Sequence, residues 1–592
     1  MKSKELARYH LHALEYFSQN QQCSLGSVIE LQAQEQPRKT AIIFAEQVIT
    51  FAELNRRSNQ YSHFFTEQGF RKGDTVALLM SNRPEFLMAL TGLAKAGIKV
   101  GLINCEMRGE VLCQSINLLQ ARGVIVGHEY LDLYQSIAKR VRLYAPTRIL
   151  VETEDREINL PPGYENLCDH LRQAKEENPE STRDIYSNDV LAYIYTSGNF
   201  GPRKAVAIQH KRFLLVGHQA GAFCHMGPDT VQYVAVPLYM NIGLNLCFGG
   251  LVVNGCTMVL KKRFSVSQFW ADVKKYQINY LVGVGEMCRY LLSMPENNDD
   301  KNNSLQVVIC NGLAPELMEP FRQRFNVEHI IEIYGTTENV GFFINHQEIP
   351  GMCGNLTLGG VRQGEVVRCD SDDTNQLLRD KDGKAIKCLP GETGVLLCEI
   401  NNISGFTGYL GDPEASASKI IYNVFNEGDS YLNTHDLVQL HYGDYISFVD
   451  RLGNTYRWKG KTVSADQVAD VILKFFGPVE DAVVYGVKVP HTEGRCGMAV
   501  LKLLEGEKLN WPKFVDYLDR RMPEHARPVF LRIITQLEGM ELLEKYKPDL
   551  KRQGYSPVLI SDPLYYFNLE KSTYCPLTLE VYESIQEGRI RL

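Results

Sequence analysis

The alternation of apolar strands and helices near the N-terminus constrains the fold of this chain more than any other feature of its sequence. Residues 76–80 (VALLM) are all apolar, Pro84 then starts a stretch of helical character, and Gly97 is suited to end it. Thr50 followed by Glu53 matches a helix-capping pattern in the preceding segment. Uninterrupted apolar strands that alternate with helices are typical of a mostly parallel sheet covered on both faces. We therefore predict an α/β fold.

The length and composition of the chain restrict its organisation and its partners. With 592 residues it is too long for one hydrophobic core, so several domains are expected. The formal net charge of −7 argues against a general nucleic-acid binder, which needs concentrated positive charge. The fifteen cysteines are odd in number and none has CxxC spacing, which favours a reducing compartment over a disulfide framework or a cysteine-rich zinc site.

One segment imitates a membrane span. Residues 233–260 contain no charged side chain, a length that would ordinarily indicate a transmembrane helix. Pro237 and several asparagines and glycines interrupt the segment, and lipid would leave the polar groups that they expose without partners. We therefore predict a buried strand, a core helix and a second strand.

Two breaks divide the sequence into segments of different character. Leu6, Tyr9, Ala13, Leu14 and Phe17 are spaced to line one face of an N-terminal helix, which favours a packed surface helix over an interfacial one. A turn-rich hairpin ends near Asp450–Arg451, and a smaller α+β unit follows. The predicted segments are an N-terminal helix over 1–25, a large domain over 26–450 and a small C-terminal domain over 451–592. Within the large domain, residues 175–189 are expected to form an exposed connector.

The most informative motif is a loop that follows an apolar strand. Residues 191–205 read LAYIYTSGNFGPRKA, so the strand runs into glycines, two hydroxyl side chains and Lys204. Glycines let backbone N–H groups turn toward an anion, hydroxyls add donors, and a lysine adds positive charge. The spacing matches neither the GxxxxGK[ST] loop nor GxGxxG. An ordinary turn between two strands therefore remains an equal alternative when this motif is taken alone.

An ordered set of motifs carries a family resemblance. YTSG is followed along the chain by YGTTE at 334–338, by THD at 434–436 and by DR at 450–451 with RWKG at 457–460. Together these motifs resemble the adenylate-forming superfamily. The segments YIYTSG, CNGLAPEL, IIEIYGTTEN, FVDRLGNTYRWKGKTVS, VYGVKVPHTEGRCGMAVL and SDPLYYFN resemble its fatty acid transport protein/very-long-chain acyl-CoA synthetase branch more than luciferases or amino-acid-activating enzymes.

The resemblance implies a fold and an activity. It implies a large AMP-binding domain with mostly parallel sheets and a small, mobile α+β C-terminal domain. It also implies ATP-dependent activation of long- or very-long-chain fatty acids, coupled to their uptake or metabolism. In the first step the fatty carboxylate attacks the α-phosphate of ATP and gives acyl-AMP and pyrophosphate; in the second, the thiol of coenzyme A takes the acyl group. Bringing anions together requires donors, cations and Mg²⁺.

The resemblance also implies a role for each site residue. Glu338 would hold Mg²⁺, Thr337 would donate to the α-phosphate, and Lys204 would act with them in catalysis. Asp450 would be the hinge of the small domain. The residues expected to bind the nucleotide are Thr196, Ser197, Gly198, Gly201, Lys204, Gly312, Tyr334, Thr337, Asp436, Arg451 and Lys459. Among these, Tyr334 and Gly312 would flank the adenine and Asp436 would accept both ribose hydroxyls.

The chain departs from the family pattern at five places. The departures are Asn199 and Phe200 in place of two threonines, Met240 in place of a histidine, Ala314 in place of an arginine, His435 in place of the glycine of TGD, and Glu544 in place of the lysine of GTFK, counted back from Gly554. A carboxylate at the lysine position would repel phosphate, so the last departure is the gravest. A shift of the alignment by one residue would restore Lys545.

These departures leave two hypotheses. The first is a long- or very-long-chain fatty acid–CoA ligase with weakened adenylation. The second is a catalytically degenerate relative that binds fatty acid or nucleotide and acts in lipid transport or as a partner of another protein.

The resemblance also bears on location. We expect peripheral association with the cytosolic face of the endoplasmic reticulum or another intracellular membrane, because the sequence starts without an apolar segment. The basic residues 261–263 are a candidate contact with lipid headgroups, and a solvated helix start is an equal alternative. The C-terminal Ile590-Arg591-Leu592 makes a peroxisomal address a weaker expectation. A homo-oligomer is a further expectation.

Overall fold

The computed structural model gives the fold of nearly the whole chain. The described residues are 3–19, 21–145, 148–153, 159–196, 204–297, 300–338, 341–369, 376–400, 405–451, 455–458, 461–490, 492, 495–534, 547–590 and 592.

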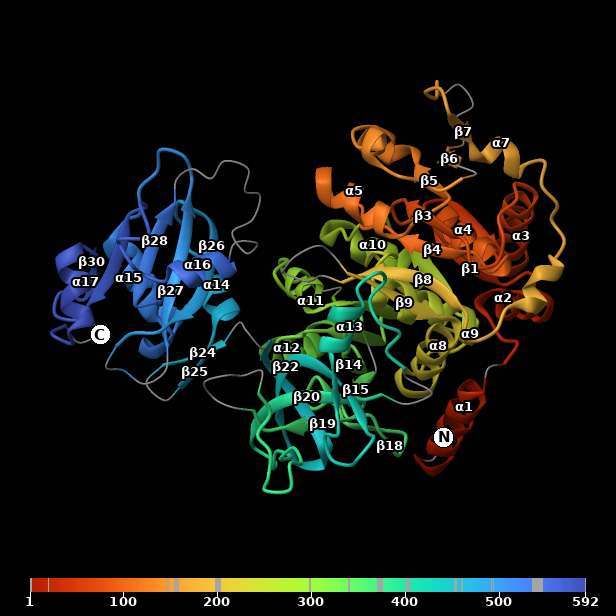
Figure 1. Cartoon of the computed structure of the whole chain (residues 1–592). Helices are drawn as coiled ribbons and strands as arrows, with labels where there is room; N and C mark the ends of the chain where they lie inside the picture. Colours follow the sequence, from red (N-terminus) through yellow and green to blue (C-terminus); the bar gives the residue numbers. More distant parts are fainter. Residues whose placement is uncertain are drawn as a thin grey trace.

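A seven-stranded sheet forms the first layer of the described fold (Figure 1). Its strands, in chain order, are β3 (Thr75–Leu79), β4 (Lys99–Leu102), β5 (Gly123–Gly127), β6 (Arg148–Glu152), β7 (Tyr164–Asn166), β8 (Val190–Tyr195) and β9 (Ala205–Gln209). They lie in the order β7-β6-β5-β3-β4-β8-β9, and every neighbouring pair is parallel except β8 and β9. The antiparallel return of β9 places the glycine-containing loop at the end of β8.

An eight-stranded sheet forms the second layer. Its strands are β1 (Thr40–Phe44), β2 (Gln47–Thr50), β10 (Val231–Val234), β11 (Thr257–Leu260), β12 (Tyr280–Val284), β13 (Val307–Asn311), β14 (His329–Tyr334) and β15 (Phe343–Asn345). The order is β15-β14-β13-β12-β10-β11-β1-β2, with antiparallel pairing only at the two edges. The prediction of an α/β fold with mostly parallel sheets is therefore confirmed.

Helices cover these two sheets, and most of them share one large hydrophobic core with both sheets, while the helices over 109–118 and 131–135 pack in a second cluster against the first sheet. The helices up to residue 418 are α1 (Ser3–Ser18), α2 (Leu25–Glu35), α3 (Phe51–Glu67), α4 (Pro84–Lys95), α5 (Gly109–Leu118), α6 (Leu131–Gln135), α7 (Leu167–Leu171), α8 (His210–Cys224), the π-helix η4 (Ile242–Phe248), α9 (Gly249–Asn254), α10 (Val266–Tyr276), α11 (Gly285–Leu292), α12 (Pro315–Phe325) and α13 (Pro413–Ser418). The core contains side chains of both sheets and of the helices between them, among them Phe86, Phe213 and Phe248.

Local sequence explains how α3 and α4 form and pack. The Thr50 hydroxyl accepts a 3.2 Å hydrogen bond from the Glu53 N–H, which caps α3, and Pro84 occupies the first turn of α4. Every residue of α4 is buried. The two helices approach so closely that a Cβ atom on Gly92 would lie 2.3 Å from the Ser58 carbonyl oxygen. Gly92 therefore sets the distance between the helices.

The uncharged segment 233–260 folds inside the large core. It contributes the end of β10, the helices η4 and α9, and β11, as predicted. Among the described residues, none of the helices has the combination of length and apolarity that a membrane crossing requires.

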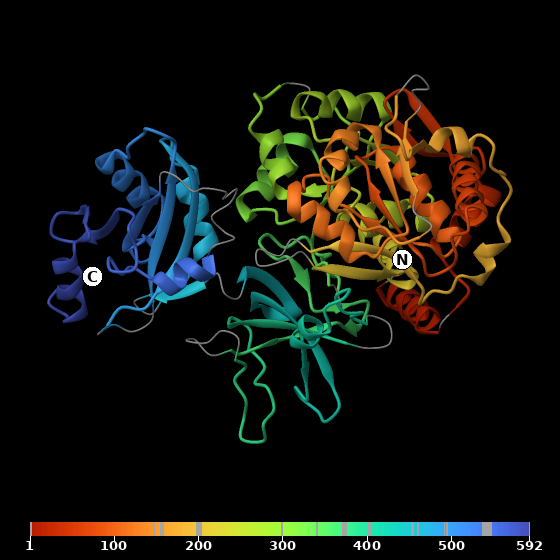
Figure 2. The same ribbon diagram turned by 45° about the horizontal axis from the view of Figure 1, so that its top comes forward.

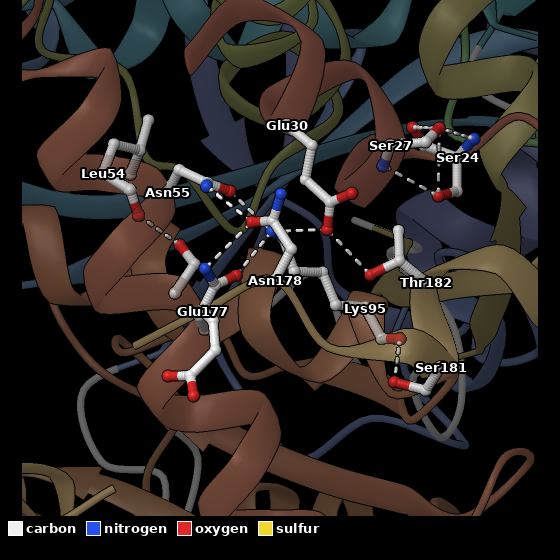
Figure 3. Close-up of polar contacts among 12 residues, drawn as sticks. Ser24, Ser27, Glu30, Leu54, Asn55, Lys95, Glu177, Asn178, Ser181 and Thr182 are labelled. Carbon is white, nitrogen blue, oxygen red and sulfur yellow. Dashed lines mark hydrogen bonds and ion pairs between the residues drawn. The ribbon is translucent and has the colours of Figure 1, made fainter. Parts of the chain in front are cut away.

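A buried lysine joins four segments of the large core (Figure 3). The Lys95 side chain is fully buried, and its Nζ atom donates to Glu30 Oε1 at 2.9 Å, Asn55 Oδ1 at 2.5 Å and Asn59 Oδ1 at 2.6 Å. Burial lowers the pKa of Lys95 to about 8. Thr182, from the 3₁₀ helix η3 (Glu180–Asp184), also donates to Glu30 at 2.9 Å.

The contacts of Lys95 correct one prediction about the connector 175–189. Thr182 and Ser187 are buried, with 4% and 0% of their surface exposed. The connector is therefore not an exposed loop throughout: Thr182 supplies a partner to the buried ionic network, and the Ser187 hydroxyl accepts the Gln21 N–H at 3.2 Å.

The N-terminal helix α1 packs on the large core as a surface helix. The His10 ring stacks on the His218 ring of α8 with 5.8 Å between centroids and meets the Phe223 ring edge-on at 5.1 Å. Leu14 is buried on the same side. The prediction of a packed surface helix is confirmed.

A third sheet follows along the chain. Its strands are β16 (Gly354–Asn355), β19 (Gly364–Val367), β20 (Thr393–Glu399), β21 (Ile420–Tyr422), β22 (Ser430–Leu440) and β23 (Tyr445–Arg451), and the short pair β17 (Thr357–Leu358) and β18 (Val361–Arg362) lies outside it. The hairpin formed by β22 and β23 ends at Arg451, where we placed the turn-rich boundary.

The C-terminal residues form a body with its own core (Figures 1 and 2). Its strands are β24 (Thr455–Trp458), β25 (Lys461–Ser464), β26 (Val479–Val487), β27 (Cys496–Leu503), β28 (Phe530–Ile534), β29 (Leu564–Asn568) and β30 (Thr573–Pro576), and its helices are α14 (Ala465–Leu473), α15 (Trp511–Arg521), α16 (Lys547–Gln553) and α17 (Leu579–Gln586). The core of this body begins at Tyr456. The domain limits given above stay predictions.

Candidate functional site

The candidate site lies where several strands of the two large sheets end. Thr196 follows β8, Gly312 follows β13, and Tyr334 is the last residue of β14. The carboxyl ends of parallel strands are the usual place for a ligand site in α/β folds, because loops from neighbouring strands meet there.

Thr196 and Lys204 stand at the two ends of the glycine-containing loop. The Thr196 N–H donates to the Lys204 carbonyl at 2.9 Å, and Tyr195 pairs with Ala205 across the strands. The loop therefore closes a hairpin. Ser197, Gly198 and Gly201 lie outside the described residues, as do Asn199 and Phe200, so their predicted roles stay predictions.

A tyrosine connects the loop lysine to the predicted metal ligand. The Lys204 Nζ atom lies 4.8 Å from the centre of the Tyr409 ring, and the Tyr409 hydroxyl donates to Glu338 Oε1 at 2.6 Å. Tyr409 is held in place because it forms a β-bridge with Val206 of β9, two residues after Lys204. The fold thus places the Lys204 ammonium, the Tyr409 ring and hydroxyl, and the Glu338 carboxylate one after another in space.

The backbone of the YGTTE segment is held from α8 and from the start of η4. Arg212 Nη2 donates to the Thr337 carbonyl at 2.8 Å, and Asn241 Nδ2 approaches the Thr336 carbonyl at 3.4 Å. Burial lowers the pKa of Arg212 to about 10, and the charge of Glu338 opposes that shift. The guanidinium therefore stays charged at neutral pH.

Tyr334 and Asp436 meet at the other side of the site. The Tyr334 hydroxyl donates to Asp436 Oδ2, and both side chains are buried. Burial, together with the charge of Asp436, raises the pKa of Tyr334. Next to Asp436, the backbone of His435 has φ +58°, a conformation that glycine adopts without strain. The sequence departure at His435 therefore places a β-carbon where the family pattern has none.

The CNGLAP turn lies beside the end of β14. Gly312 has φ +72°, and the Asn311 side chain donates to the Ile333 carbonyl at 2.8 Å. The Glu332 carboxyl accepts the Leu313 N–H, and burial raises its pKa to about 8. These bonds tie the turn to the strand that carries Tyr334, so Gly312 and Tyr334 lie at neighbouring strand ends. Their predicted roles at an adenine stay predictions.

The remaining predicted residues are described in part or not at all. Asp450 and Arg451 lie in β23, where Arg451 pairs with Asp436 along the backbone ladder. Lys459 and Glu544 lie outside the described residues, so neither the predicted nucleotide contact nor the loss of the family lysine is tested.

Sequence reasoning missed two functional candidates, Tyr409 and Arg212. Tyr409 lies 71 residues from Glu338 along the chain, and Arg212 lies 125 residues from Thr337. Neither residue belongs to a motif that we recognised, and the β-bridge that brings Tyr409 to Lys204 forms only in the folded chain.

Comparisons with known proteins give the family of the chain. The model of the AMP-binding enzyme family matches residues 29–410. The chain is 34% identical to long-chain fatty acid transport protein 6 of Mus musculus, over 94% of this chain and 90% of that protein. It is 31% identical to a medium/long-chain fatty acid–CoA ligase of Mycobacterium tuberculosis, over 96% and 92%. Among solved structures, ATP-bound MatB from Rhodopseudomonas palustris shares the fold with a TM-score of 0.68 at 19% identity, covering 91% of this chain and 100% of that one.

The fold and the site therefore define an enzyme of the AMP-binding, adenylate-forming class. Within that class, the chain belongs to the family of the long-chain fatty acid transport proteins and fatty acid–CoA ligases. The resemblance inferred from the motifs is confirmed.

Proposed function

We propose that this chain joins a long- or very-long-chain fatty acid to coenzyme A in two steps. In the first, a carboxylate oxygen of the fatty acid bonds to the α-phosphorus of ATP and pyrophosphate leaves. In the second, the coenzyme A sulfur bonds to the acyl carbon, AMP leaves and the thiol proton is released. The observation that carries the proposal is the convergence of Lys204, Tyr409 and Glu338 beside the strand end that bears Tyr334.

The predicted site residues divide the work of binding ATP for the first step. Lys204 supplies positive charge to the phosphates, Thr337 donates to the α-phosphate, and the loop of Thr196, Ser197, Gly198 and Gly201 cradles the triphosphate. Asp436 accepts the ribose hydroxyls, and the adenine lies between Tyr334 and the Gly312 turn.

Mg²⁺ fits the donor set of the site. In the described part of the chain, groups of three or more His, Cys, Asp or Glu side chains that could hold a metal do not occur. Mg²⁺ needs no such group, since it commonly takes one or two carboxylates and completes its shell with water and substrate phosphates. Glu338 is the carboxylate for this role, and the bound ion would neutralise phosphate charge.

The small domain completes the proposal. We place the hinge at Asp450, with Arg451 and Lys459 approaching the nucleotide, and the limits of the segments at residues 25 and 450. Because Glu544 replaces the family lysine, adenylation is expected to be slow relative to thioester formation. We also propose peripheral association with an intracellular membrane, where the apolar substrate is found.

Two half-reactions test the proposal. ATP–pyrophosphate exchange is measured with a series of C16 to C24 fatty acids, and thioester formation is measured from synthetic acyl-AMP and coenzyme A. Exchange and thioester formation together support the ligase. Thioester formation without exchange supports a ligase whose first step is lost at Glu544, and Glu544→Lys should then restore exchange. Neither reaction, with retained fatty-acid binding, would support the degenerate relative instead and end the ligase proposal.

A further inference from the structure

Arg212 is a charged residue beside the candidate site that none of the roles above uses. It lies in the first turn of α8, directly after β9, and its guanidinium reaches the YGTTE segment. The side chain is half-buried, and its Nε atom is buried with no hydrogen-bond partner among the residues that the structure describes. A charged group held in this way costs free energy unless its contacts compensate for that cost.

The contacts of Arg212 indicate what that role is. Its Nη2 atom donates to the carbonyl of Thr337 at 2.8 Å, and its charge interacts with the carboxylate of Glu338. The Glu338 side chain is also held by the Tyr409 hydroxyl at 2.6 Å. Arg212 and Tyr409 thus hold the Thr337–Glu338 pair from two separate elements, one through the backbone and one through the carboxylate.

A fixed cation at this place matters most while the phosphates react. Preorganised charges and donors stabilise a transition state without having to reorient. Displacing such a group by about 1 Å can lower the reaction rate about 100-fold. Acyl transfer to coenzyme A releases AMP and involves neither pyrophosphate nor the metal that balances its charge, so it depends less on where Glu338 stands.

We propose that Arg212 is a positioning residue for the first half-reaction. It fixes the Thr337 carbonyl by a hydrogen bond and sets the electrostatic environment of Glu338 by its charge. This inference rests on the ligase function proposed above, and it adds a residue of α8 to the machinery for adenylation.

Three variants separate the hydrogen bond from the charge. Arg212→Met removes both, Arg212→Gln keeps an N–H donor, and Arg212→Lys keeps the charge without the planar fork. A hydrogen bond with one charged partner typically corresponds to about 10- to 100-fold in rate, so Arg212→Met should lower the exchange rate by that factor. Thioester formation from acyl-AMP should fall less than about threefold on the same scale. Arg212→Lys should retain more exchange than Arg212→Gln.

The control is Arg57→Met. Arg57 is another half-buried arginine, with 21% of its side chain exposed, and it pairs with Glu85 at 3.4 Å away from the site. This variant should leave the ratio of the two half-reactions unchanged. The inference is overturned if Arg212→Met retains exchange within twofold of the unaltered protein, or if both half-reactions fall together with the melting temperature. Absence of both reactions in the unaltered protein would instead contradict the ligase proposal, and this inference with it.

Discussion

The Tyr409 hydroxyl donates a 2.6 Å hydrogen bond to Oε1 of Glu338, from a segment that follows the large sheets in the chain. The face of the same ring lies 4.8 Å from the Lys204 Nζ atom. Tyr409 therefore connects the end of the glycine-containing loop with the end of the YGTTE segment. The arrangement orients the carboxylate by a hydrogen bond and holds the lysine ammonium over the face of the same ring.

Replacing Tyr409 by phenylalanine tests this connection. The ring and its contact with Lys204 are kept, while the bond to Glu338 is lost. Because a hydrogen bond to a charged acceptor contributes about 1.5–3 kcal/mol, the exchange rate should fall about 10- to 100-fold. The measurement is ATP–pyrophosphate exchange, with Tyr422→Phe as the control at a tyrosine that is 60% exposed. Equal rates in the two variants would show that the bond does not matter.

The buried carboxylate of Asp436 is expected to bind the nucleotide. Asp436→Asn keeps the shape of the side chain and an acceptor for Tyr334, but it removes the charge that favours two ribose hydroxyls. The affinity for ATP, measured by calorimetry, should fall about tenfold, which corresponds to about 1.4 kcal/mol. The matched control is Asp382→Asn, because Asp382 is an exposed aspartate. An unchanged dissociation constant would remove Asp436 from the site.

The Lys95 network is expected to stabilise the large core (Figure 3). Lys95→Met leaves Glu30 and two asparagine oxygens without their shared donor. Removal of one partner from a buried ionic network destabilises proteins by about 3–5 kcal/mol, and the partial exposure of Glu30 reduces this to about 2–4 kcal/mol here. Urea unfolding measures the change. Lys502→Met is the control, since Lys502 is a less buried lysine that pairs with Glu480 at 3.0 Å.

The same lysine should make stability depend on pH. Burial lowers the pKa of Lys95 from an ordinary value of 10.5 to about 8, so the folded state releases the proton at lower pH than the unfolded state does. Between those values the unfolded state binds more protons, and the contribution of Lys95 to the free energy of unfolding therefore rises with pH. The stability difference between the unaltered protein and Lys95→Met should grow by about 1–2 kcal/mol from about pH 7 to about pH 9.5. A difference that shrinks over this range would contradict the lowered pKa.

His435 should carry backbone strain beside Asp436. A residue with a β-carbon at φ +58° destabilises the folded state by about 1–2 kcal/mol relative to glycine. Glycine gives back part of that gain, because its backbone has more conformational freedom in the unfolded chain. His435→Gly should therefore stabilise the protein by about 0.5–1 kcal/mol, seen as a higher melting temperature. His435→Ala, which keeps the β-carbon, is the control and should give no such gain.

The regular elements could be predicted because their signals are local. The apolar run 76–80 became β3, Pro84 starts α4, Thr50 caps α3, and the uncharged segment 233–260 folded as strand, helix and strand. The connector 175–189 was predicted wrongly in part, because its composition is polar while Thr182 and Ser187 are buried. The polar composition of the connector does not show whether a buried charged group elsewhere in the chain, here Lys95, needs a partner from it.

The candidate site divides in the same way. Gly312, Tyr334, Thr337, Glu338 and Asp436 could be proposed from the sequence because each belongs to a motif of consecutive residues. Tyr409 and Arg212 were not found, because their relation to the site exists only as a distance in space.

The sequence by itself determined the α/β class, several of the strands and helices, and the family, because these depend on periodicity and on short motifs of consecutive residues. Only the tertiary structure decided that a tyrosine joins Lys204 to Glu338 and that an arginine of α8 holds Thr337. Such contacts depend on which strand ends and helix starts the packing of the sheets brings together, and the residues near one point are then tens to hundreds of positions apart in the chain.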